Sequence, residues 1–106
     1  MKNGQLALDD LATLQRRGQP TTPVLVIAQG GGRLINCTDL NDLARRIVEL
    51  TPEGAVLTPT TWSWPDLDSV RGFTVRSGQD IVASCSTLGR PGAELEAAIA
   101  AARGRA

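Results

Sequence analysis

The sequence predicts an α+β fold: a two-layer sandwich in which a mostly antiparallel sheet of about five strands has two or three helices packed on one face. Short β-branched apolar runs alternate with segments whose apolar residues recur at helical spacing. Some of these short runs come in pairs separated by a few glycine or polar residues, which is typical of antiparallel hairpins. A length of 106 residues leaves room for one domain, so residues 1–106 are expected to form a single domain.

An amphipathic helix is predicted near the N-terminus, over residues 5–17, and Gly18 and Pro20 end it. Its apolar positions form one stripe at helical spacing: Leu8, Leu11, Ala12 and Leu14. Residues 24–28 are a β-branched apolar run bounded by turn residues, and residues 33–37 are extended in character. We therefore expect these two runs to form a hairpin whose tip is the glycine loop between them.

The clearest helix of the sequence follows. Thr38 or Asp39 is expected to cap its N-terminus, and Gly54 marks its end. Its apolar residues form one broad face, which predicts packing against the sheet: Leu40, Leu43, Ala44, Ile47, Val48 and Leu50. Residues 55–59 return to strand character. Because Pro59 cannot donate to a strand ladder, we expect this strand to continue toward Trp62 along a sheet edge.

The last third of the chain combines a short helix, a hairpin and a long helix. One or two helical turns are expected over residues 65–72, because Pro65 suits a first helical position and Gly72 a helix end. Residues 73–86 predict a second hairpin with Ser77–Asp80 as its turn. A C-terminal helix should bury one face made by Leu95, Ala98, Ile99 and Ala102.

The residue types that usually move protons in enzymes are scarce. The sequence has no histidine and no tyrosine, and its single lysine is Lys2. A serine or cysteine nucleophile needs an adjacent base, most often histidine. Cys37 and Cys85 lie in apolar runs without the close pairing of zinc sites, so we expect two buried structural thiols. We therefore expect no catalytic residue, no metal site, no cofactor and no enzymatic activity.

Carboxylates are the chemistry that remains. They occur as four pairs: Asp9 with Asp10, Asp39 with Asp42, Asp66 with Asp68, and Glu94 with Glu96. Helix capping and the helix dipole account for acids near helix starts without any chemistry. A carboxylate-dependent enzyme, which would need two acids to converge in one pocket, stays open as an alternative.

The charge balance argues against a general nucleic-acid binder. Eleven basic residues balance eleven acidic ones, so the chain has no long-range field to attract nucleic acid. A nucleic-acid accessory remains an alternative if folding gathers the arginines on one face: Arg33, Arg45, Arg46, Arg71 and Arg76. No secretory signal and no run of ~20 apolar residues is visible, so we expect a cytoplasmic protein that does not enter a membrane.

Trp62 and Trp64 are the most conspicuous candidate site residues. At i and i+2 of an extended segment they should project to the same face. One interpretation places both rings in the core, sealing one end of the sandwich over Leu67 and Val70. The other places at least one ring at the surface as an anchor for a partner, because tryptophan is enriched at binding hot spots. A role in base stacking would need a basic groove, and the local residues are acidic.

The glycine loop is the second candidate surface. It lacks the lysine and the following helix of a phosphate-binding loop, so a hairpin tip with Gly31 and Arg33 available for contacts is the better interpretation. We therefore predict a small protein-binding module, an adaptor, accessory regulator or stoichiometric inhibitor such as a phage- or plasmid-encoded anti-defence protein. Its expected contact residues are Trp62, Trp64, Arg33 and Gly31. Self-association through an edge strand near residues 58–62, giving a homodimer, is the competing interpretation.

Overall fold

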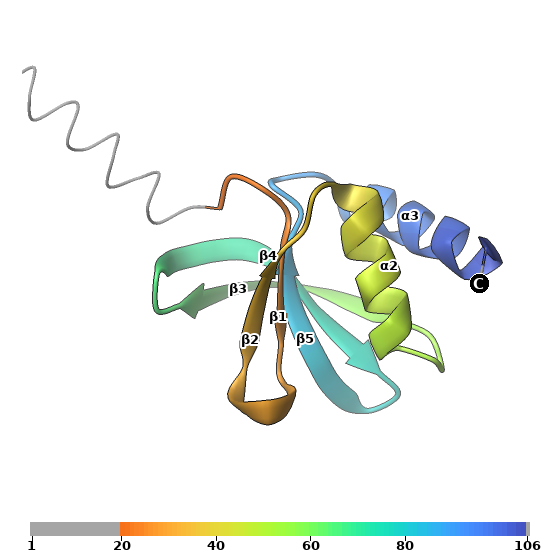
Figure 1. Ribbon diagram of the computed structural model, residues 1–106, viewed down its shortest axis with the longest axis horizontal. Coiled ribbons are helices and arrows are strands. Elements are labelled where there is room, and N and C mark those ends of the chain that lie inside the picture. Colours follow the sequence, from red (N-terminus) through yellow and green to blue (C-terminus); the bar gives the residue numbers. More distant parts are fainter. Residues whose placement is uncertain (1–19, 106) are drawn as a thin grey trace, which may run out of the picture.

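A computed structural model describes residues 20–105 of the chain, so the helix predicted over residues 5–17 lies outside the described residues (Figure 1). The elements are β1 (Val24–Ile27), a 3-10 turn (Gln29–Gly31), β2 (Arg33–Asn36), α2 (Leu40–Leu50), β3 (Val56–Trp64), β4 (Leu67–Ser77), β5 (Asp80–Ser86) and α3 (Gly92–Arg105). Five antiparallel strands and two helices form a small α+β domain, which confirms the predicted fold class.

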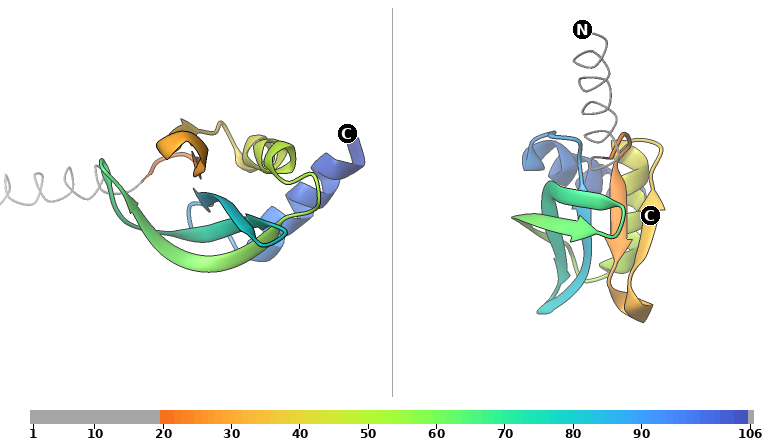
Figure 2. Two further views of the ribbon diagram at one scale, coloured as in Figure 1. Left: turned by 90° about the horizontal axis from the view of Figure 1, so that it is seen from below. Right: turned by 90° about the vertical axis from the view of Figure 1, so that its left-hand side faces the viewer.

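The sheet has the strand order β2-β1-β5-β4-β3. Both predicted hairpins, β1–β2 and β4–β5, are present, and the chain turn after Ser77 ends at Asp80 as expected. The strands β2 and β3 are the edges of the sheet, so the predicted edge position of residues 58–62 is confirmed. The sheet is strongly curved, and the end of the β3–β4 hairpin bends toward the β1–β2 hairpin (Figure 2).

The short helix predicted over residues 65–72 is wrong. β4 begins at Leu67, and Pro65 and Asp66 form the turn of a long β3–β4 hairpin. Proline and aspartate favour tight turns as well as first helical turns, so the local signal fitted both structures. Pairing decided between them, because Val70 lies opposite Trp62 and is only 1% exposed.

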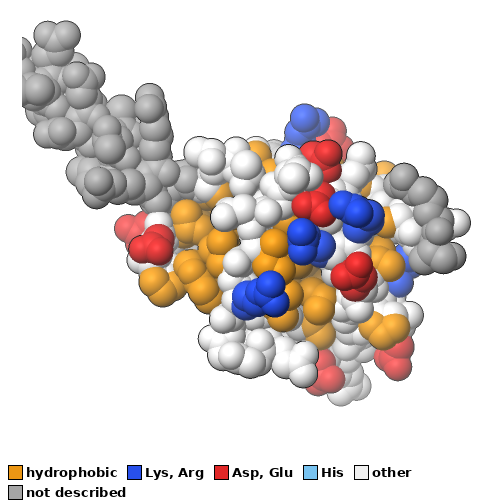
Figure 3. Space-filling model, viewed as in Figure 1, with side chains coloured by type: hydrophobic (Ala, Val, Ile, Leu, Met, Phe, Trp, Pro, Cys, Tyr) orange, Lys and Arg blue, Asp and Glu red, His pale blue; other side chains and the backbone are white. Residues whose placement is uncertain are grey.

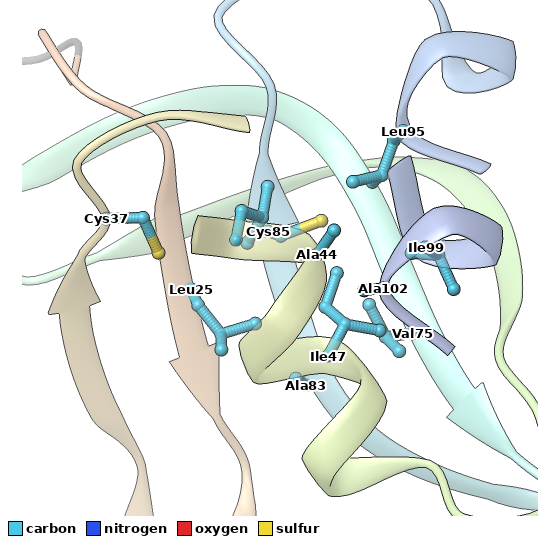
Figure 4. Close-up of a cluster of buried hydrophobic side chains, with 11 residues drawn as sticks. Leu25, Cys37, Ala44, Ile47, Val75, Ala83, Cys85, Leu95, Ile99 and Ala102 are labelled. Atoms are coloured by element: carbon cyan, nitrogen blue, oxygen red, sulfur yellow. The ribbon is translucent and has the colours of Figure 1, made fainter. Parts of the chain in front are cut away.

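The hydrophobic core lies between the sheet and the two helices (Figure 4). Leu25 and Cys85 are cross-strand neighbours on this face, and Leu43, Ile47 and Leu95 pack on it from α2 and α3. Burial raises the pKa of the Cys85 thiol to about 12. Burial is also the largest cause that raises the pKa of Cys37. Both cysteines are buried and free, so they are structural thiols, as predicted.

The N-terminus of α2 is held by two aspartates. The Asp39 carboxylate accepts a hydrogen bond of 2.8 Å from the Asp42 amide, so Asp39 is the cap. The buried Asp42 carboxylate in turn accepts 3.0 Å and 2.7 Å hydrogen bonds from the Thr38 amide and from Arg45. The Nε atom of Arg46 lies 3.3 Å from the same carboxylate. These contacts fix the angle at which the chain enters α2.

Asp42 should therefore make the fold sensitive to acid. The hydrogen bond from the Thr38 amide, helped by Arg46 and Arg45, holds the pKa of Asp42 below its ordinary value of 3.8, although burial opposes this. The ionised form is thus favoured by folding, and its contribution is complete above the ordinary pKa and is lost as pH falls through the lower, folded pKa. We expect Asp42→Asn to lower the free energy of unfolding by about 1–2 kcal/mol at neutral pH. Urea unfolding at stepwise lower pH should show a smaller loss for Asp42→Asn than for the wild type.

The matched control is Glu49→Gln, which changes an exposed carboxylate on the same helix. This variant should keep the wild-type stability at neutral pH. Identical stability–pH curves for Asp42→Asn and the wild type would show that the Asp42 contacts do not contribute to folding.

Candidate functional site

The sheet face opposite the helices carries Trp62. Cross-strand pairs place Val26, Leu34 and Val70 on this same face, which we call the tryptophan face. Val24 shares it and, like Val70, is 1% exposed, although neither belongs to the core cluster under the helices. The protein therefore buries a second, smaller apolar set on the side of the sheet that α2 and α3 do not cover.

Trp62 is held in place by β5. Its Nε1 atom donates a 3.1 Å hydrogen bond to the carbonyl oxygen of Cys85. Because β4 lies between β3 and β5, the indole must span β4 to reach this oxygen. Gly72 lies on β4 at this point, and a Cβ atom there would collide with the Cys85 carbonyl. Trp62 is half-buried and hydrogen-bonded, but it does not belong to the core cluster that the helices cover.

Trp64 lies against the glycine loop. A Cβ atom on Gly32 would be 3.1 Å from the Cζ3 and Cη2 atoms of the Trp64 ring. The tips of the β1–β2 and β3–β4 hairpins therefore meet through this ring, although β2 and β3 are opposite edges of the sheet. Hydrophobic side chains gather at this end of the molecule beside acidic ones (Figure 3). Trp64 is half-buried, and no hydrogen bond of its side chain to a described residue is found.

Gly31 and Arg33 lie on either side of Gly32 in the chain, but only Gly31 belongs to the glycine loop that meets the Trp64 ring. Gly31 is exposed, has a φ of 90° and would have open space around a Cβ atom. Arg33 is exposed and makes no ion pair with any described residue. However, Arg33 lies opposite Ile27, whose face is the one that the helices cover. The structure thus joins Trp64 to the glycine loop, but the Arg33 side chain projects from the other face of the sheet.

The five arginines of the nucleic-acid alternative do not all lie on one face. Arg45 and Arg46 contact Asp42 on α2, while Arg33 and Arg71 project on the helix side of the sheet. Arg76 follows the core residue Val75 and so lies on the tryptophan face. Basic and acidic side chains are interspersed on the face seen in Figure 3. This distribution does not favour a phosphate-binding surface.

The carboxylates form no candidate metal site in the described part of the chain. Within residues 20–105, no three Cys, Asp or Glu side chains are arranged to hold a metal ion. Asp39 and Asp42 are engaged in the helix cap. Of three grooves formed by residues 20–105, one is lined by a single acid, Asp39, and the other two by none. No helix in the described part of the chain is long and apolar enough to cross a membrane.

Sequence reasoning missed the two residues that place the tryptophans, Gly72 and Gly32. Gly72 resembles a helix end in its local sequence, and Gly32 resembles any residue of a flexible loop. Nothing in either stretch indicates that a distant ring packs there. Comparison of the chain with protein-family models, with curated proteins and with solved structures found no match.

Proposed function

We propose that the protein is a non-enzymatic binding module for another protein, acting as an adaptor, accessory regulator or stoichiometric inhibitor. Its contact surface would be Trp64 with the glycine loop around Gly31. The observation that carries this proposal is that Trp64 packs against a glycine at the rim of the sheet, where it is only half-buried. Tryptophan at such a position is the residue type most often found at binding hot spots.

The surface around Trp64 is suited to a protein partner. The ring is already positioned by Gly32, so little side-chain entropy would be lost when a partner covers it. The half-buried Val26 and Leu34 extend the apolar surface on the tryptophan face. Exposed loop residues such as Gly31 offer backbone groups to a partner without a side chain in the way. Protein interfaces commonly have aromatic residues at their apolar centre and polar residues at the rim.

The test is to compare Trp64→Ala with the wild type in affinity capture from an extract of the native host. Trp64→Ala should lose about tenfold or more of the captured partner, as expected for a tryptophan hot spot. It should remain folded by circular dichroism, because Trp64 does not belong to the core cluster. The control is Val56→Ala, which removes an exposed apolar side chain, 54% accessible, at the opposite end of β3 from Trp64. Val56→Ala should capture as well as the wild type. A folded Trp64→Ala variant with undiminished capture would refute the site.

Self-association is the second candidate, because β3 is an edge strand of nine residues with a neighbour on one side only. Such an edge is a template for pairing with another strand. Pro59 lies in the middle of β3 and lacks a backbone donor, which weakens this template. Light scattering on purified protein separates the two candidates. A stable particle of twice the monomer mass would support the dimer, and a monomer at high concentration would exclude it.

A further inference from the structure

A tight turn after β5 contains a bulky residue in an unusual conformation. The Arg90 amide donates a 3.1 Å hydrogen bond to the Thr87 carbonyl, which closes a four-residue turn. Its central residues, Leu88 and Gly89, have φ angles of 57° and 82°. Turns with two positive φ angles normally use glycine, asparagine or aspartate at these positions. Leu88 is also 46% exposed, so burial of its side chain does not explain why leucine stands there.

A second non-glycine residue with a positive φ angle, Ser69, lines the same groove as Leu88. Among the described residues, Ser69 (φ 49°) and Leu88 are the two non-glycine residues with positive φ. Both line one groove of about 430 Å³, together with Pro20, Arg71, Ser86 and Gly89. Left-handed conformations of non-glycine residues cluster at binding sites, where function maintains them. The volume lies within the range of ligand pockets.

The exposed polar side chains that line this groove can donate hydrogen bonds. Arg71 is exposed and has no ion pair with any residue from 20 to 105. Ser86 is 2% exposed, and its Oγ atom accepts a 3.3 Å hydrogen bond from the Leu88 amide, which helps to hold the turn. Ser69 adds an exposed hydroxyl. No carboxylate lines the groove, which favours a negatively charged ligand.

Two charged neighbours lie just outside the lining. Asp68 precedes Ser69 in the chain, and Arg90 follows Gly89. The Arg90 guanidinium lies 3.3 Å from the Glu94 carboxylate, so its positive charge is already paired. Arg71 is therefore the cation that can meet a ligand in this groove. The rim also has an apolar side, which Leu88 and Pro20 supply.

We propose that this groove binds a carboxylate attached to an apolar group, as at the C-terminus of a peptide. Arg71 would pair with the carboxylate through two parallel hydrogen bonds, the geometry that guanidinium groups favour. The exposed Ser69 hydroxyl would donate to the same oxygens, and Leu88 would pack on the adjacent apolar side chain. The lining of this groove includes none of Trp64, Gly31 and Gly32, so the site does not share the residues of the proposed contact surface. This inference is therefore independent of the proposed contact surface.

The experiment is a titration of ¹⁵N-labelled full-length protein with N-acetylated tetrapeptides that end in leucine, valine or phenylalanine. Peptides with a free carboxylate should shift the amide signals of Arg71 and of Ser86 to Gly89, and the same peptides with a C-terminal amide should not. Arg71→Gln should weaken binding about tenfold, as expected for a charge-assisted pair. The matched control is Arg76→Gln, an exposed arginine on the same strand, which should bind within about twofold of the wild type.

Leu88→Gly gives a second readout. Glycine adopts positive φ without strain, so this variant should keep or raise the melting temperature while its peptide affinity falls. Isovalerate tests the source of the carboxylate. If isovalerate binds as tightly as the peptides, the groove is a site for small acids; if it binds much more weakly, the groove is a site for peptide C-termini. Both results support a carboxylate site. The proposal is overturned if amidated peptides bind equally well, if Arg71→Gln binds like the wild type, or if no signal moves at millimolar peptide.

Discussion

Gly72→Ala should be among the most damaging substitutions in the described part of the chain, lowering the free energy of unfolding by about 3 kcal/mol. The added Cβ atom would overlap the carbonyl oxygen of Cys85 and lie 3.1 Å from the Cα atom of Ser86. Both are backbone atoms in the centre of the sheet, so they cannot rotate away as a side chain would. Relief requires β4 to move from β5, which would also separate Trp62 from the carbonyl that it bonds.

Urea unfolding followed by tryptophan fluorescence measures this loss, because Trp62 and Trp64 are the only tryptophans of the chain. Gly104→Ala is the control, since a Cβ atom there meets nothing within 4 Å and the residue lies in α3. Alanine is the better helix former, so this variant should be as stable as the wild type or gain up to about 1 kcal/mol. An unfolding midpoint of Gly72→Ala equal to that of the wild type would contradict the close approach of β4 and β5.

The tryptophans show where prediction from the sequence ended. Spacing and flanking prolines indicated an extended, edge-strand segment, and β3 is that strand. Whether each ring was core or surface stayed open, because the answer depends on contacts made by residues far along the chain. Trp62 is held by Cys85, 23 residues away, and Trp64 by Gly32 on another hairpin. These contacts arise from the curvature of the whole sheet, for which a local pattern carries no signal.

The helices were easier to predict than the β3–β4 hairpin. The apolar face of α2 follows from helical spacing alone, and Asp39 from the preference for aspartate at helix caps. Residues 65–72 carry equally good helix start and stop signals, yet they lie in a turn and a strand. The difference is that α2 has enough residues to form a stripe, whereas a stretch of two turns does not. Its structure was decided by pairing with β3.

Leu95→Ala is the second variant from which we expect a large effect, a loss of roughly 3 kcal/mol of unfolding free energy. The Leu95 side chain is 0% exposed and packs from α3 into the cluster formed with α2 and the sheet. Its removal takes away apolar contact and leaves a cavity that Leu43 and Ile47 can fill only in part. Thermal and urea unfolding both measure the loss, and Leu88→Ala is the matched control.

Leu88 is the same residue type at 46% exposure, and alanine at this position keeps the positive φ, so the control variant should stay within about 0.5 kcal/mol of the wild type. Leu95 lies on the helix side, whereas Trp64 lies at the sheet rim against Gly32. Leu95→Ala should therefore lower stability without lowering partner capture, provided that the protein is assayed where it is folded. Trp64→Ala should show the opposite combination. If both variants lost stability and capture together, the contact surface and the core could not be separate parts of the molecule.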